Sequence, residues 1–491
     1  MSHLAFPELR PFTASVGNNA RPAITRTPHR YLRWLLGAAI LLLIYRIGLM
    51  ALLPLADTTE ARYGEIARQA VANGFWLMPH IDPNTPFFAK PPLSTWASAV
   101  SMILFGVNEF AARLPALLAS LIALWVAMSF AKELQIRQRW LVAPVLATSP
   151  LFFLCAGAVM TDALQMVLIV AALYFAWRAL DAADKGHPER HWRIAFWVMI
   201  GLGALCKGLA TWALIGLPLI AYAVTERRPL QMFKQVFDWG GVAIAACIFM
   251  PWYIAAEYYN PGFLNYFIIG EHFARFLVPG WKGDHYGIAQ HQPIGAIWIF
   301  WTLGILPWIG VFVMELLRLF SKQRKQTKPI ERFLWCATLA PLIFFTFSRN
   351  IIWTYGLTAA LPFSVLAARW LEKASATMQR RASIGVMAIA CLYVLSGPYV
   401  QEKVAANSDR DLIAAFNRIA EPGTELAYRM HPAYSSDYYS RGNLEYDPNA
   451  ALANNPEKEL VVIDSSDIQK DGIKADHVLY VGKFHALIRP E

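Results

Sequence analysis

The sequence predicts an all-α, polytopic membrane protein with a small α/β domain at its C-terminal end. Of its 491 residues 56% are hydrophobic, the mean hydropathy is +0.36, and only 16% are charged. Ordinary soluble domains carry about 25% charged residues. A spanning helix needs about 20 mostly apolar residues, and the chain supplies roughly ten such runs. These runs exclude a soluble fold.

The N-terminal region divides into a polar tail and a first span. Residues 1–30 are polar and basic and contain four prolines, which predicts a disordered cytoplasmic tail. The apolar run 31–55 is longer than the core of a signal peptide, which has about 7–15 residues. We therefore expect this run to stay in the protein as its first membrane span.

The apolar runs of residues 31–400 predict a transmembrane domain of about 11–13 helices. Segment 93–107 is apolar but short, so we expect an interfacial or re-entrant helix there. Eleven spans are placed near residues 31–55, 113–131, 140–159, 163–180, 193–206, 208–225, 239–256, 293–317, 332–347, 351–371 and 382–400.

The basic residues of the loops predict the orientation. The predicted inner segments hold 25 Lys and Arg, and the outer segments before the last span hold 8. Cytoplasmic loops of membrane proteins carry such an excess, so the N-terminus is expected inside. The same asymmetry explains the net charge of +10 without a nucleic-acid partner. An odd number of spans then places residues 401–491 outside.

The C-terminal segment 401–491 differs in composition from the rest. Residues 409–420 show the periodicity of an amphipathic helix, and residues 459–464 and 477–481 read as strands. They predict a small α/β domain without a catalytic motif.

Polar residues of the first predicted outer loop, residues 56–112, form two candidate groups. Asp57 precedes a helical pattern that contains Glu60, Arg62 and Tyr63, where it could orient or deprotonate a ligand or simply cap the helix. Lys90 stands between aromatic residues and two prolines. It could bind a phosphate as a point charge or reach the lipid headgroups.

Further candidates lie in the other predicted outer segments. Asp162 and Lys207 occupy short loops, and Arg349 and Tyr355 stand at the start of the tenth span. Loop 257–292 is rich in aromatic and ionisable residues, which suit a sugar ring or an interfacial belt equally well. Its His272 and His285, beside Glu271 and Asp284, leave a divalent metal site open, although their spacing fits no tight ligand pattern. Arg275 is a further candidate of the same loop.

The ordered set of short motifs over residues 31–371 resembles the lipid-linked-sugar glycosyltransferases of the GT-C class. The resemblance is strongest to the aminoarabinose (lipid A) transferases and the protein mannosyltransferase-like family. The matching strings are 59–68 (TEARYGEIAR), 88–92 (FAKPP), 113–115 (RLP), 161–162 (TD), 207–208 (KG), 251–253 (PWY), 266–267 (YF), 271–272 (EH), 275–276 (RF), His285, 306–308 (LPW) and 354–355 (TY).

This resemblance implies GT-C architecture in a bacterial inner membrane, with an active site on the periplasmic face. It implies an undecaprenyl-phosphate-sugar donor and a lipid A or other envelope acceptor. It assigns Asp57 and Asp162 as the acidic residues of the site, and Lys90, Lys207, Arg275 and Tyr355 to the donor phosphate.

Three places depart from the aminoarabinose pattern. Thr59 stands where an Asp is common, and Ala89 where a Glu is common. The Lys-Leu-Pro element before Tyr355 is replaced by Ile351, Ile352 and Trp353. They leave the sugar open. A protein O-mannosyltransferase-like enzyme and a lipid or sugar transporter are the alternatives.

Overall fold

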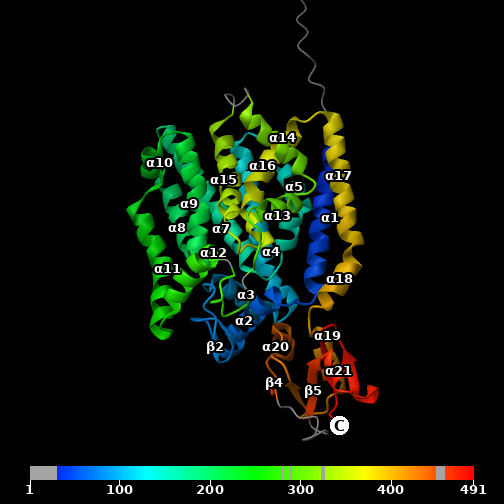
Figure 1. Ribbon diagram of the computed structural model, residues 1–491. Coiled ribbons are helices and arrows are strands. Elements are labelled where there is room, and N and C mark those ends of the chain that lie inside the picture. Colours follow the sequence, from blue (N-terminus) through cyan, green and yellow to red (C-terminus); the bar gives the residue numbers. More distant parts are fainter. Residues whose placement is uncertain (1–29, 279, 288–289, 322–326, 449–458, 491) are drawn as a thin grey trace, which may run out of the picture.

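The computed structural model shows a bundle of helices with a small mixed domain at one end (Figure 1). It describes residues 30–278, 280–287, 290–321, 327–448 and 459–490. The predicted tail, apart from its last residue, lies outside these ranges. We call the end of the bundle that carries the C-terminal domain the loop end.

Each of the eleven predicted spans coincides with one helix or with two successive helices. The helices are α1 (Arg30–Leu52), α4 (Glu109–Glu133), α5 (Val142–Thr148) with α6 (Pro150–Cys155), α7 (Thr161–Asp184), α8 (Arg190–Lys207), α9 (Leu209–Thr225), α11 (Trp239–Tyr259), α13 (Ala296–Gly304) with α14 (Ile309–Phe320), α15 (Pro329–Thr346), α16 (Leu357–Lys373), and α17 (Ala376–Leu395) with α18 (Gly397–Ala405). Shorter helices are η1 (Arg139–Leu141), α10 (Pro229–Val236) and η4 (Trp353–Gly356).

Five described helices are long and apolar enough to cross a membrane on their own. They are Arg33–Leu52, Glu109–Glu133, Thr161–Asp184, Trp239–Tyr259 and Ala376–Leu395. The pair α13 and α14, bent by 119°, adds a sixth if it counts as one span. The other predicted spans are shorter or interrupted helices, so the multi-pass class is confirmed and the number eleven stays a prediction.

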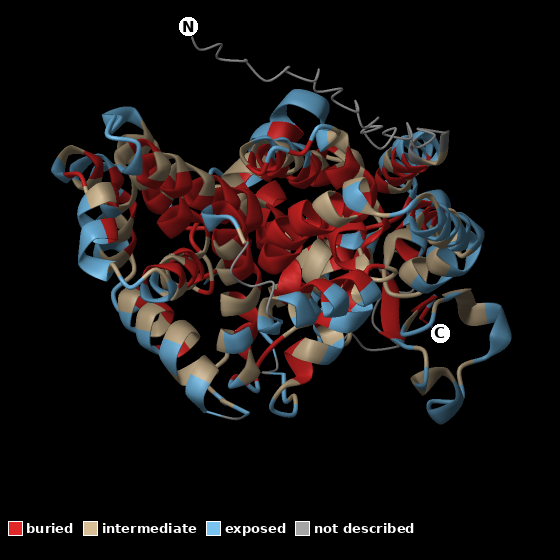
Figure 2. Ribbon diagram, turned by 90° about the horizontal axis from the view of Figure 1, so that it is seen from above, coloured by how far each residue is buried: buried red, intermediate tan, exposed pale blue. Residues whose placement is uncertain are grey.

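Burial follows the pattern expected of a helical bundle in lipid. The most apolar stretch of α7 is 78% buried, which makes it a central helix. Apolar side chains such as Ile44, Trp125 and Ile254 are exposed on peripheral helices, where lipid rather than water would meet them. Viewed along the bundle, buried residues gather in the middle and exposed ones on the rim (Figure 2).

Short elements cover the loop end. They are α2 (Thr59–Asn73), the hairpin of β1 (His80–Asp82) and β2 (Thr85–Pro86), α3 (Leu93–Phe105), the π-helix η2 (Asn265–Ala274) and α12 (Arg275–Leu277). In α2 residues 64–70 are all buried, and Ala61, Ile66 and Ala70 have no exposed surface. The short apolar helix predicted at 93–107 is α3, which packs against α2 and α4.

The C-terminal domain has a five-stranded sheet in the order β4-β3-β5-β7-β6. Strand β5 pairs in parallel with β3 and antiparallel with β7. The predicted helix and the two predicted strands appear as α19, β5 and β6. The elements are α19 (Arg410–Ile419), β3 (Glu425–Tyr428), α20 (Tyr434–Ser440), β4 (Glu445–Tyr446), β5 (Glu459–Asp464), α21 (Asp467–Lys470), η5 (Ala475–His477), β6 (Val478–Val481) and β7 (His485–Ile488).

Candidate active site at the loop end of the bundle

A cavity of about 300 Å³ opens among α7, the α8–α9 junction, η2, α12, α15, η4 and α16. We call the charged part of its lining, Asp162, Lys207, Glu271 and Arg275, the polar wall; apolar lining residues include Phe276, Phe344, Phe345 and Leu357. A lining that combines charged and apolar side chains suits a ligand with a charged head and a hydrocarbon chain.

Asp162 and Lys207 form the first ion pair of the polar wall. Lys207 Nζ lies 3.2 Å from Asp162 Oδ1, and both side chains are largely buried. The Thr354 hydroxyl donates to the same oxygen at 2.9 Å, and Lys207 Nζ lies 5.3 Å from the centre of the Tyr355 ring. Asp162 stands in the first turn of α7, where the positive end of the helix dipole favours a carboxylate.

Glu271 organises a second group of charges. Lys90 Nζ donates to its Oε2 at 2.9 Å, and Arg275 Nη1 donates to its Oε1 at 3.0 Å. Arg275 also reaches Asp284, at 3.3 Å. Burial alone would raise the pKa of Glu271, but the charges and hydrogen bonds of Lys90 and Arg275 lower it to about 2. The carboxylate therefore holds two cations together that would otherwise repel each other.

The two histidines do not converge on Glu271. The His272 ring nitrogens face the carbonyl oxygens of Phe267, at 2.7 Å, and Lys207, at 3.2 Å. Burial lowers the pKa of His272, although these carbonyls oppose the shift. The His285 ring stacks on Tyr266. Within the described ranges no group of three or more His, Cys, Asp or Glu side chains could hold a metal ion.

Arg62 and Tyr63 lie beside the cavity, in an aromatic layer. The guanidinium of Arg62 lies 5.5 Å from the centre of the Tyr63 ring and 5.9 Å from that of Phe87, and it donates to the Tyr286 carbonyl. The Tyr286 hydroxyl accepts from the Phe88 amide at 2.9 Å and donates to the Pro86 carbonyl at 2.7 Å. These contacts fix the backbone immediately before Lys90.

Asp57 and Glu60 do not line the cavity. Both oxygens of Asp57 accept hydrogen bonds from Ser435 of the C-terminal domain, one from its amide at 3.1 Å and one from its hydroxyl. Burial raises the pKa of Asp57 to about 6, and the Ser435 hydrogen bonds only partly oppose this. Glu60 pairs with Arg113 at 2.7 Å and accepts from the Val159 amide.

Arg349 is exposed, so the structure does not bring it into the polar wall either. Its neighbour Asn350 is buried and lines the cavity instead.

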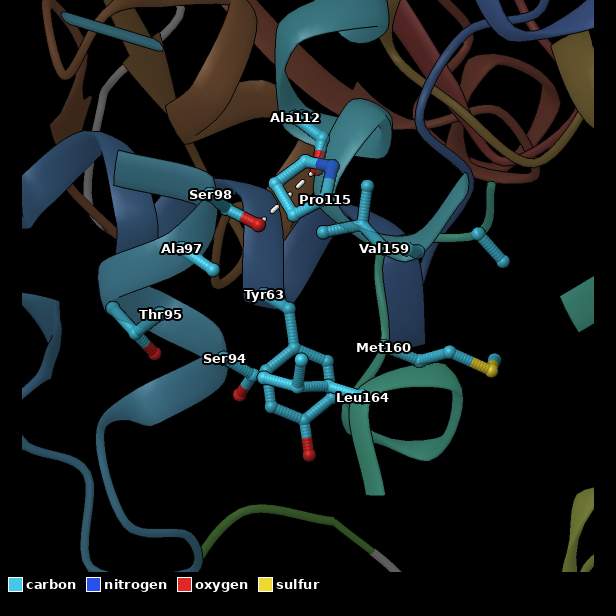
Figure 3. Close-up of a pocket in the computed structure, with 12 residues that line it drawn as sticks. Tyr63, Ser94, Thr95, Ala97, Ser98, Ala112, Pro115, Val159, Met160 and Leu164 are labelled. Carbon is cyan, nitrogen blue, oxygen red and sulfur yellow. Dashed lines mark hydrogen bonds between the residues drawn. The ribbon is translucent and has the colours of Figure 1, made fainter. Parts of the chain in front are cut away.

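A second, much smaller cavity of about 20 Å³ lies on the other side of the start of α7 (Figure 3). Tyr63, Ser94, Ser98 and Leu164 are among its lining residues, and the Ser98 hydroxyl donates to the Ala112 carbonyl at 3.1 Å. Asp162 and Leu164 are two positions apart in α7. Each helical residue is rotated by about 100° from the previous one, so these two side chains lie on nearly opposite faces of the helix. The first turn of α7 therefore separates the two cavities.

Sequence reasoning assigns no donor-binding role to three contributors to the site. Thr354 is part of a matching motif, Asp284 is considered only as a metal ligand, and Asn350 is noted only as the neighbour of Arg349. A polar residue at the start of an apolar span, as Thr354 is, could have been marked as costly to bury without a partner.

Comparisons with a protein-family model and with curated proteins both find similarity to glycosyltransferases that use lipid-linked sugars. The sequence model of the dolichyl-phosphate-mannose-protein mannosyltransferase family matches residues 89–254. The chain is 27% identical over 348 residues to the undecaprenyl phosphate-alpha-4-amino-4-deoxy-L-arabinose arabinosyl transferase of Erwinia tasmaniensis, covering 69% of this chain and 59% of that protein. It is 28% identical over 342 residues to the protein of that name from Pseudomonas aeruginosa, covering 66% and 58%.

A solved structure shows the same fold. ArnT from Cupriavidus metallidurans, bound to undecaprenyl phosphate, matches with a TM-score of 0.72 and 19% identity, covering 94% of this chain and 98% of that chain. The chain spans about three fifths of the length of the curated relatives that it matches. These comparisons confirm the resemblance to lipid-linked-sugar glycosyltransferases that the ordered motifs indicated.

Proposed function

We propose that this protein is an integral membrane glycosyltransferase that moves a sugar from undecaprenyl phosphate to lipid A or another lipopolysaccharide acceptor. The observation that carries the proposal is the cavity whose lining combines the cations Lys207 and Arg275 with many apolar side chains. A polyprenyl phosphate likewise combines an anionic head with a hydrocarbon chain. The names of the curated relatives supply the donor and the transfer.

The proposed reaction needs cations at the leaving group. An acceptor oxygen attacks the anomeric carbon, the bond from that carbon to the phosphate oxygen breaks, and its electron pair stays on the phosphate. Lys207, Arg275 and Lys90 would stabilise this growing charge, and Tyr355 would help to orient the head group. Glu271 already holds two of these cations, Lys90 and Arg275, close to each other.

Asp162 is the proposed acidic residue of the site. If the acceptor is a phosphate, it needs no base, and Asp162 would fix Lys207 and orient the sugar. If the acceptor is a hydroxyl, a carboxylate must take its proton. A catalytic role for Asp57 stays a prediction, since its oxygens are occupied by Ser435.

We further propose that the protein lies in a bacterial inner membrane with its N-terminus in the cytoplasm and the loop end in the periplasm. The excess of Lys and Arg in the predicted inner segments supports this orientation. Membrane lipids would then surround the exposed apolar rim of the bundle.

The test is an assay of purified protein in vesicles with a radiolabelled undecaprenyl-phosphate sugar and lipid A. Arg275→Ala should raise the KM for the donor by roughly 10- to 100-fold, because a hydrogen bond to a charged group contributes about 1.5–3 kcal/mol. The control is Arg318→Ala, whose guanidinium pairs with Glu315 on α14 away from the cavity. It should leave the KM unchanged.

Two outcomes would redirect the proposal. Transfer to a peptide hydroxyl but not to lipid A would favour the mannosyltransferase-like alternative, whose family model matches residues 89–254. Donor uptake into vesicles without transfer to any acceptor would indicate a transporter and overturn the enzyme.

A further inference from the structure

One helix of the C-terminal domain contacts the elements that carry the candidate site. Helix α20 packs against α2, and its Tyr434 joins a cluster built around Ile66, Phe87 and Tyr286. That cluster combines α2, the segment before Lys90 and the loop after α12. A domain without a catalytic motif thus supplies a side chain to the layer behind the site.

Arg62 connects Tyr434 to this layer. Its guanidinium lies 5.8 Å from the centre of the Tyr434 ring, in addition to its contacts with Tyr63 and Phe87. A guanidinium in this range of an aromatic face is attracted by the ring, and more strongly when water is excluded. Loss of one ring would leave the cation less well held.

The path continues from Arg62 to Lys90. Arg62 donates to the Tyr286 carbonyl, and the Tyr286 hydroxyl bonds to the backbone of both Pro86 and Phe88. Phe87 and Ala89 are almost completely buried, so the segment has little freedom to move independently. Lys90 follows directly and meets Glu271 at 2.9 Å.

We propose that the C-terminal domain completes the active site, with Tyr434 acting as a positioning residue that holds Arg62 and, through it, the Phe87–Lys90 segment. This inference rests on the proposed function, because the position of Lys90 matters for binding a donor phosphate. The Tyr434 ring provides the contact and not its hydroxyl, since the interaction is with the aromatic face. Arg62 and Tyr434 therefore act as a pair.

The kinetic test uses full-length protein in vesicles. Tyr434→Ala should raise the KM for the donor by roughly three- to tenfold, with a smaller change in kcat, and Tyr434→Phe should restore the wild-type value. Tyr446→Ala removes a ring of the same type from the exposed strand β4 and should have no effect. Arg62→Met should raise the KM as well. The double variant Arg62→Met/Tyr434→Ala should be less impaired than the two single effects predict together.

A second measurement keeps this inference separate from the proposed function. Hydrogen exchange of the peptide covering residues 80–92 should speed up in Tyr434→Ala and stay at the wild-type rate in Tyr434→Phe and Tyr446→Ala. If wild-type protein transfers no sugar, the proposed function fails while this comparison still decides the positioning role. Unchanged exchange and an unchanged KM in Tyr434→Ala would overturn it, as would a Tyr434→Phe variant as impaired as Tyr434→Ala.

Discussion

At the residue scale, most buried charges of the loop end are paired. Glu271 forms ion pairs with two cations, and Asp162 forms an ion pair with Lys207 and accepts a hydrogen bond from Thr354. Removing one partner of a buried pair leaves the other charge uncompensated, which costs about 3–5 kcal/mol. Asp57 is different, because its two hydrogen bonds come from a neutral serine. Its ionisation is therefore poorly supported, as is that of Asp437 in α20, whose pKa burial raises to about 7.

Asp57 should make stability depend on pH. Burial raises its pKa from 3.8 to about 6. Between these pH values the folded state binds a proton that the unfolded state has already released, so the protein loses stability as pH rises through about 6. Asp57→Asn should remove this loss, gaining on the order of 2 kcal/mol relative to wild type at pH 7.5 but little at pH 4. Thermal unfolding at several pH values measures the effect.

The control for this prediction is Asp411→Asn, which changes an exposed carboxylate of the C-terminal domain. It should keep the wild-type pH profile. His485, Asp409 and Asp437 also interact with Asp57 and remain in every variant, so the difference between wild type and Asp57→Asn reports Asp57 together with its coupling to them. A constant difference at all pH values would contradict the prediction.

The sequence predicted individual site residues from two kinds of signal. Asp162 and Lys207 lie in short breaks between apolar runs, and Glu271 and Arg275 lie in a loop rich in ionisable residues. The structure brings all four to one cavity. It could not predict that Asp57 meets Ser435, because 378 residues separate the two. A carboxylate before a helix looks the same in sequence whether it faces a ligand, caps the helix or anchors another domain.

At the element scale, the α8–α9 junction sets the position of Lys207. Gly208 has a φ of +62°, which side-chain-bearing residues rarely adopt, and it turns the chain directly after Lys207. A β-carbon at this position would lie 2.6 Å from Phe267 and 3.2 Å from His272. The glycine thus lets η2 approach the end of α8.

Gly208→Ala should therefore displace η2 and lower donor transfer by roughly 5- to 100-fold, since overpacking costs about 1–3 kcal/mol. Gly74→Ala is the matched control, because Gly74 also has a positive φ, +74°, but no atom within 4 Å of the added carbon. It should cost roughly 1 kcal/mol of stability and leave transfer intact. Equal transfer by the two purified variants would show that close packing at Gly208 does not matter.

Helices were predicted more reliably than their interruptions. Apolar length marked each run, but it did not show that residues 142–155 break between α5 and α6 or that α13 and α14 bend by 119°. Pro150 supplies a local cause for the first break, because proline lacks the N–H that a continuous helix would use. The π-helical form of η2 has no signal in hydrophobic periodicity.

At the scale of the whole molecule, the loops that connect the helices lie at two opposite ends of the bundle. The C-terminal domain, α2 and the loop after α12 meet at the loop end, whereas the α7–α8 turn lies beside α10 at the opposite end, where Arg228 pairs with Asp184 (Figure 1). The number of Lys and Arg residues in each loop predicted which loops share an end of the bundle, because this number depends on composition alone. The contact between α20 and α2 depends on side-chain packing and could not be read in the same way.

The proposed orientation predicts which end reacts with an impermeant maleimide. Asp476→Cys in the C-terminal domain should be labelled in cells with a permeabilised outer membrane, and His187→Cys, in the α7–α8 turn, only after the inner membrane is opened. Cys247 and Cys391, the two exposed native cysteines, are replaced by serine in both variants. Labelling in the reverse order would invert the orientation.

The pairing of Lys90 and Arg275 with Glu271 also bears on turnover. A phosphate that enters the site exchanges with a carboxylate already bound to both cations, so its affinity reflects the difference between two sets of charge-assisted bonds. Such an exchange holds the anion less tightly than two free cations would. For the proposed reaction this favours release of the spent lipid phosphate, because Glu271 recaptures both cations as the product departs.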